Sequence, residues 1–145
     1  MPSPQPTRTA RRVGADWTHQ DGERTTLTIT VCRTCSARWF PPRDTCSTCA
    51  STDVGDVTSD TRGTVYASSV VRIAPRGFQA PYVLTYVDIS GVRLLAHSPG
   101  RDQALAPGTA VRLTVAPIAD SVEGAVMSYA VTPLGDQHEP TGEER

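Results

Sequence analysis

The sequence predicts a mainly β protein, in which a small metal-stapled module precedes a five-stranded barrel. Three observations support this fold class. Four cysteines form two close pairs within residues 32–49, short alternating or β-branched runs fill most of the chain after residue 63, and that later stretch leaves almost no room for a helix. At 145 residues, the chain is long enough for one compact domain with a small appendage.

Composition divides the chain into four parts. Residues 1–15 are rich in Pro, Thr and Arg and offer nothing to bury, and residues 135–145 are similar, so we expect both ends to be disordered. Between them we expect the metal module with its lead-in at residues 16–60 and the barrel at residues 61–134. Within the lead-in, Trp17 is expected to anchor a short helix or turn.

Strands are predicted from hydrophobic alternation. Thr25–Val31 alternates polar residues with Leu, Ile and Val, and this strand delivers the chain to the first cysteine. The barrel strands are expected at residues 64–73, 82–89, 92–97, 110–116 and 125–132. The Ser90-Gly91 pair predicts a tight hairpin between the second and third of these. Five strands in so short a stretch favour an OB-fold barrel, with a loop rather than a helix over the Pro- and Gly-containing residues 98–107.

The cysteines have the spacing C-x2-C-x10-C-x2-C. Each C-x2-C pair lets two thiolates converge on one ion from a tight turn, and two such knuckles complete a tetrahedral four-thiolate site that suits Zn²⁺. Iron is the alternative metal, because the same four thiolates hold it. Two disulfides or four ordinary buried thiols would not require paired spacing. The expected ligands are Cys32, Cys35, Cys46 and Cys49, and because four protein ligands close the site, the metal is expected to be structural.

Charge and hydropathy narrow the classes of partner. The formal net charge is −1, and all 14 basic residues are arginine, so there is no global electrostatic argument for nucleic acid or an anionic membrane. No apolar run has the length of a membrane span, and the first residues lack the apolar stretch of a secretory signal. We therefore expect a cytoplasmic protein with no membrane partner.

No residue pattern indicates an active site. His138-Glu139 begins like a zinc-protease motif, but Gly142 stands where the second histidine belongs. The cysteines are expected to be metal ligands, which leaves no thiol nucleophile. Asp88 and Asp120 are isolated carboxylates, and His97 is interpreted as a histidine at the barrel rim. The chain is therefore not expected to be an enzyme on its own.

The cysteine segment resembles the DUF35 family. An aromatic pair and two prolines follow the first knuckle, a second knuckle comes next, and Gly63-Thr64-Val65-Tyr66 then opens the barrel. The resemblance extends over about Leu27–Leu134 and implies a rubredoxin-like zinc ribbon followed by an OB-fold, associated with acyl-CoA chemistry. Ser36 and Ala50 depart from the family pattern, because they stand at knuckle positions where the family often has glycine.

The same resemblance implies a partner protein. Family members typically accompany a thiolase-fold enzyme, which is a thiolase, a ketosynthase-like acyltransferase or a lipid-transfer-type aldolase. In such hetero-oligomers the DUF35 chain helps to form the acyl-CoA or acyl-substrate site, while the partner holds the nucleophile. We therefore expect a non-catalytic scaffold subunit. The alternative is a zinc-ribbon and OB-fold protein that binds single-stranded nucleic acid, which balanced charge and sparse aromatics disfavour.

Two loops are candidate contact surfaces. Trp39, Phe40, Pro41 and Pro42 either anchor the partner or seal the metal module onto the barrel. Arg76, Phe78 and Tyr82, in and beside the loop between the first two barrel strands, are candidate acyl-CoA contacts; the alternative is a solvated loop with Phe78 folded back. Three arginines on the predicted strands are expected on solvated faces of the barrel: Arg72, Arg93 and Arg112.

Overall fold

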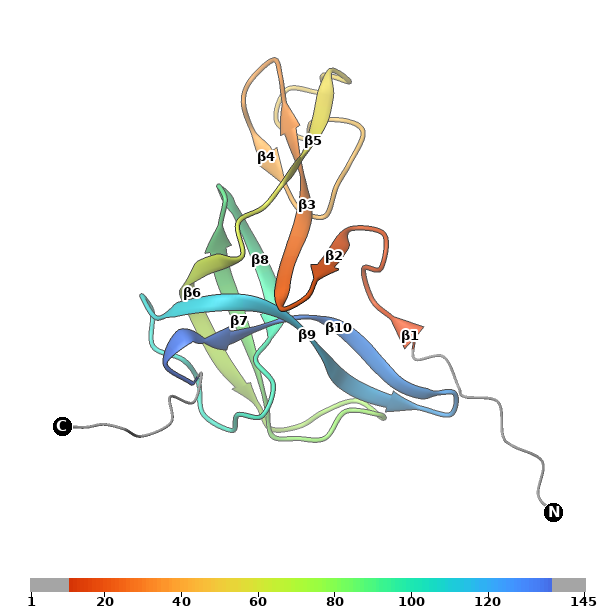
Figure 1. Ribbon diagram of the computed structural model, residues 1–145, viewed down its shortest axis with the longest axis vertical. Helices are drawn as coiled ribbons and strands as arrows, with labels where there is room; N and C mark the ends of the chain where they lie inside the picture. The colour runs from red at the N-terminus through yellow and green to blue at the C-terminus, as the bar shows by residue number, and fades with distance from the viewer. Residues whose placement is uncertain (1–10, 137–145) are drawn as a thin grey trace.

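The computed structural model describes residues 11–136, which form a barrel with a narrow ribbon standing on one end of it (Figure 1). The strands are β1 (Arg11–Arg12), β2 (Thr18–Asp21), β3 (Arg24–Cys32), β4 (Arg38–Trp39), β5 (Val54–Thr58), β6 (Arg62–Val71), β7 (Tyr82–Ile89), β8 (Val92–His97), β9 (Ala110–Ser121) and β10 (Gly124–Pro133), and a 3-10 turn, η1 (Leu134–Asp136), follows. No helix among these residues is long and apolar enough to cross a membrane.

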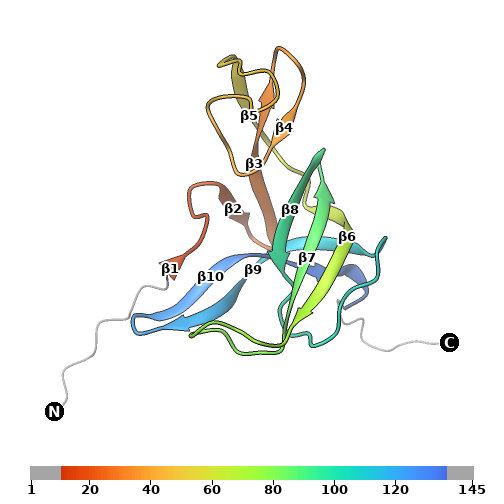
Figure 2. The ribbon, with the colours of Figure 1, turned by 180° about the vertical axis from the view of Figure 1, so that it is seen from behind.

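Strands β6 to β10 close into the barrel. The order β6-β7-β8-β10-β9 returns to β6, with β8 and β10 parallel and the other pairs antiparallel (Figure 2). The closure between β8 and β10 is brief, because only Ala130 and His97 are paired there. The connection over residues 98–109 contains turns and bends and no helix, as its prolines and glycines predict. These features confirm the expected five-stranded OB-fold.

Local sequence signals locate most strand ends. Strands β7 and β8 coincide with their expected ranges, and Ser90 and Gly91 take φ values of 50° and 84° in the turn between them. Strand β9, however, continues past Ala116 to Ser121. Pro117 lies at a bulge, where Met127 pairs with Pro117 and Val126 pairs with Ala119. A bulge tolerates the missing proline N–H, so the strand continues where the sequence indicated an end.

Residues 13–21 form a turn and then a strand. The turn over residues 13–17 ends at Trp17, whose N–H donates to the Gly14 carbonyl at 3.1 Å, as the turn alternative predicted. Thr18–Asp21 then pairs with the first part of β3 across a turn at Gly22, so the helix alternative is wrong. Expected disorder up to residue 15 does not hold for β1, which pairs in parallel with Val126 and Met127. That pairing is available because β10 extends beyond β8 and leaves an open backbone edge there. Residues 1–10 and 137–145, including the His138-Glu139 pair, lie outside the described residues.

The ribbon and the barrel share one hydrophobic core. Leu27 and Ile29 of β3 are completely buried, and they belong to the same cluster as the inward residues of the barrel strands. Ser59 fixes this position, because its hydroxyl accepts from the Leu27 N–H at 2.9 Å and its N–H donates to the Leu27 carbonyl at 2.8 Å. The remaining members of the cluster are Val65, Val87, Ile89, Val92, Leu94, Ala96, Leu105, Val111, Leu113 and Val131. The base of the ribbon is therefore held by the barrel core.

Candidate metal centre and contact surfaces

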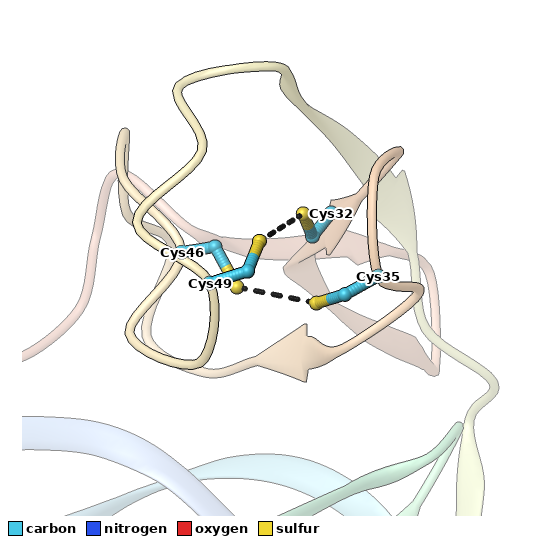
Figure 3. A group of neighbouring side chains, drawn as sticks. All are labelled: Cys32, Cys35, Cys46 and Cys49. Carbon is cyan, nitrogen blue, oxygen red and sulfur yellow. Dashed lines mark hydrogen bonds between the residues drawn. The ribbon is translucent and has the colours of Figure 1, made fainter.

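The two cysteine knuckles have the same backbone construction. The N–H of Ser36 donates to the Cys32 carbonyl at 2.9 Å, and the N–H of Ala50 donates to the Cys46 carbonyl at 2.8 Å. Ser36 and Ala50 take φ values of 67° and 63°, which is the left-handed region that favours glycine. Each knuckle turns back at this residue and so directs its two sulfurs toward those of the other knuckle (Figure 3).

The four sulfur atoms have the spacing of a tetrahedral site. All four lie within 4.8 Å of one another, and the Cys32–Cys49 and Cys35–Cys46 Sγ distances are both 3.6 Å (Figure 3). A Zn–S bond of about 2.3 Å gives a tetrahedron with sulfur atoms about 3.8 Å apart. A disulfide would bring two sulfurs to about 2 Å, whereas all four cysteines are free thiols here. The cluster is a structural metal centre.

Electrostatics at the cluster favours a bound cation. At Cys46, burial opposes ionisation, but the N–H groups of Cys49 and Thr48 outweigh it and lower the pKa of the thiol to about 6. At Cys49, the N–H of Ser51 favours the thiolate, but burial and the three neighbouring sulfurs outweigh it and raise the pKa to about 12. Since thiolates this close repel one another, complete ionisation requires a positive ion among them.

Trp39 packs against the metal centre from within the ribbon. Its indole N–H is buried without a conventional hydrogen-bond acceptor, and it lies toward the Cys46 sulfur, where it helps to lower the pKa of that thiol. The Arg43 guanidinium covers the ring at 4.6 Å from its centroid. Thr30 holds this segment in place, because its hydroxyl accepts from the Arg43 N–H at 3.0 Å. The half-buried Trp39 therefore supports the centre.

Phe40 joins the ribbon to the barrel. Its ring meets Trp17 edge-on with centroids 5.9 Å apart and Tyr129 edge-on at 5.4 Å, and all three rings pack against the shared core. These contacts match the alternative in which the aromatic pair seals the module onto the barrel. Pro41 is exposed and Pro42 is half-buried beside it. The outward part of this loop is therefore its proline pair.

The far end of the barrel carries a stack of three rings. Phe78 lies 5.5 Å from Tyr82 and 5.9 Å from His97, and Tyr82 lies 5.3 Å from His97, all as stacked pairs. Tyr82 and His97 line a cavity of about 600 Å³. Burial lowers the pKa of His97, so the imidazole favours its neutral form. Arg76 is exposed and is not among the residues that line this cavity.

The sequence did not reveal the position of His97 in this stack. Its place at the end of a predicted strand indicated a rim residue, but the stacking depends on Phe78, which reaches it from the preceding loop. That loop is fixed by the N–H of Asp120, which donates to the Gly77 carbonyl at 2.8 Å. A histidine that ends a strand near a loop aromatic is the one signal that the sequence offered.

Comparison with known proteins places both parts of the chain. Residues 20–55 match the family model described as the ChsH2 rubredoxin-like zinc ribbon domain, and residues 56–116 match the ChsH2 C-terminal OB-fold domain. A DUF35 domain-containing scaffold protein of Methanocaldococcus jannaschii is 34% identical over 88 residues, which are 58% of this chain and 62% of that protein. The match thus spans less than two thirds of that relative's length.

A solved structure supports the same placement. The chain is similar to one in the Ltp2-ChsH2(DUF35) aldolase, with a TM-score of 0.56 and 28% identity over 74% of this chain and 84% of that chain. Both domain types thus occur here in the order that the DUF35 resemblance implied. This chain belongs to the DUF35 family.

Proposed function

We propose that this chain is a non-catalytic scaffold subunit that binds a thiolase-fold enzyme and helps to form its acyl-CoA or acyl-substrate site. The observation that carries this proposal is the structural likeness, over 74% of the chain, to the Ltp2-ChsH2(DUF35) aldolase, whose name gives a DUF35 protein together with a second protein. The M. jannaschii relative, named as a scaffold protein, supports the same role.

The chemistry of the described residues agrees with a scaffold. A metal held by four thiolates has no open position for a substrate or a water molecule. Both carboxylate oxygens of Asp88 are engaged by Arg93, at 2.7 and 3.1 Å, and that hydrogen-bonded pairing lowers the pKa of Asp88. A carboxylate held in this way is a poor general base. The nucleophile for acyl transfer or carbon–carbon cleavage therefore belongs to the partner.

The metal in this proposal is zinc, which supplies folding free energy to the ribbon and takes no part in the reaction. The same four thiolates could hold iron in the same tetrahedral geometry, and elemental analysis distinguishes zinc from iron. Zinc-loaded protein is colourless and contains one zinc per chain, whereas an iron-loaded chain is coloured by thiolate-to-iron charge transfer.

The partner contacts the loop that the metal centre supports. Phe40 and Arg43 fix the two ends of this loop, Phe40 by packing on the barrel and Arg43 through Thr30. The exposed Pro41 and its neighbour Pro42 lie between these fixed points. A loop that is already ordered loses little conformational entropy on association. Trp39 and Phe40 thus support the loop by packing on the metal centre and the barrel, and the two prolines contact the partner.

The acyl-CoA channel borders the three-ring stack at the other end of the barrel. Tyr82 and His97 line the cavity there, and they present aromatic surface that suits a flat adenine. The exposed Arg76 lies in the same loop as Phe78, and its long, flexible side chain suits a phosphate of the same ligand. In this proposal the partner supplies the remaining wall of the channel.

Co-purification tests the proposal. A tagged copy of the full chain is expressed in its own host, and the proteins that remain bound after size-exclusion chromatography are identified. A thiolase-fold protein in a defined hetero-oligomer, whose acyl-CoA turnover falls at least tenfold without this chain, is the expected result. A thiolase-fold protein that runs at full rate alone, with no complex at micromolar concentrations, refutes it.

Single-stranded nucleic acid is the second candidate, and one observation favours it. Tyr66 of β6 and Tyr86 of β7 are exposed on neighbouring strands, and β7, the second barrel strand, belongs to the face that OB-folds use for oligonucleotides. However, Arg93 covers the Tyr66 ring at 3.3 Å and is itself paired with Asp88, which occupies one stacking platform. Fluorescence anisotropy with a labelled single strand separates the candidates, since this one requires salt-dependent binding.

A further inference from the structure

Three arginines from separate strands surround one cavity on the side of the barrel. The cavity has a volume of about 540 Å³. It is lined by Arg24 of β3, Arg62 of β6 and Arg112 of β9, together with Glu23, Thr61, Leu113 and Leu134. It shares no residue with the cavity beside Tyr82 and His97. The arginine cavity is therefore a separate feature of the fold.

The sheet register forces two of these charges together. Arg62 and Arg112 are direct partners across the antiparallel β6–β9 pair. Side chains of directly opposite residues lie on the same face of a sheet, and like charges in that relation are destabilising. The β6–β9 pairing closes the barrel and involves only Arg62–Thr64 on the β6 side. Two positively charged side chains thus lie opposite each other at the β6–β9 seam, the short strand pairing that closes the barrel.

No ion pair within residues 11–135 neutralises these guanidiniums. The two ion pairs in that part of the chain involve Arg33 and Arg93 instead, and none of the three cavity arginines makes a side-chain hydrogen bond there. The Nε atom of Arg112 is buried and has no acceptor. Arg112 is half-buried, which corrects its expected place on a solvated face. A buried donor without an acceptor costs free energy, and an anion in the cavity would remove that cost.

We propose that the arginine cavity binds a phosphate or diphosphate group. Three guanidiniums and the one carboxylate of Glu23 leave two positive charges, which match a phosphate dianion better than a single carboxylate. Planar guanidiniums bind phosphate oxygens in pairs, and the Thr61 hydroxyl adds a further donor at the cavity wall. The source is either a free inorganic anion, phosphate or diphosphate, or the phosphates of a nucleotide-containing ligand. Binding offsets the repulsion at the β6–β9 seam and so stabilises the fold.

Thermal unfolding with inorganic diphosphate and with ADP tests this site on the full zinc-loaded chain. Each ligand is titrated at constant ionic strength set with KCl, and affinities are measured in parallel by calorimetry. The ligands are expected to raise the Tm of the unmodified chain. The variant Arg62→Gln is expected to bind about tenfold more weakly, as for the loss of a charge-assisted hydrogen bond. ADP that binds more tightly than diphosphate indicates a nucleotide source, and equal or tighter binding of diphosphate indicates a free inorganic anion.

The matched control is Arg72→Gln, which removes one exposed arginine outside the cavity. Without ligand, Arg62→Gln is expected to raise the Tm, because it relieves the repulsion with Arg112, whereas Arg72→Gln leaves the Tm unchanged. A variant that is more stable but binds the ligand more weakly cannot owe its weaker binding to a damaged fold. Equal Tm shifts in all three proteins, or an equal response to acetate, would show general ionic effects and overturn the proposal.

Discussion

Replacing Phe40 with alanine is expected to destabilise the protein by about 2–3 kcal/mol. Truncation of a fully buried phenylalanine costs about 3–5 kcal/mol. Phe40 is half-buried, which reduces the packing loss by about half, but the change also removes two edge-to-face contacts worth about 0.5–1.5 kcal/mol each. The two losses overlap, because the same atoms make both.

Phe78 provides the matched control, since it is also half-buried and also contacts two rings. It does not belong to the residues that pack against the shared core, so Phe78→Ala is expected to cost only about 1 kcal/mol. Urea unfolding at a fixed concentration of free zinc measures both variants, with intrinsic fluorescence reporting on Trp17 and Trp39. Equal losses for the two variants would refute the inference that Phe40 couples the ribbon to the barrel.

Three further predictions concern the metal, the knuckles and the ring stack. Removal of the metal with a chelator should expose the amides of residues 46–58 to hydrogen exchange. The Leu27 amide should stay protected, because that part of β3 lies in the barrel core. Cooperative unfolding of the whole chain would contradict this prediction. Ala50→Gly should stabilise the protein by about 0.5–1 kcal/mol in urea unfolding, because it relieves a left-handed alanine, whereas Ala37→Gly should not. Burial lowers the pKa of His97, so the folded protein favours the neutral imidazole. The contribution of His97 to the free energy of unfolding is therefore complete above the ordinary pKa near 6.5, and it is lost as the pH drops toward the lowered pKa. His97→Phe should remove that loss, and unfolding curves at pH 7.5 and 5 that change equally in both proteins would contradict it.

Much of the architecture was predictable because its signals are local. Paired cysteines, alternation with period two and the Ser90-Gly91 turn each depend on a few neighbouring residues, and they located the metal ligands, strands β7 and β8, and the hairpin. The glycine positions of the knuckles were also visible, since Ser36 and Ala50 stand where the backbone turns left-handed. The end of β9 was not predictable, because the bulge beside Pro117 depends on the partner strand.

The sequence by itself therefore determined which residues hold the metal and which runs form the barrel. Only the tertiary structure decided that Leu27 and Ile29 belong to the barrel core, that Phe40 points inward, and that His97 lies in a ring stack. It also decided that Arg62 and Arg112 face each other across a seam. Each of these relations joins residues far apart along the chain, and strand order and register, which set them, are fixed only when the barrel closes.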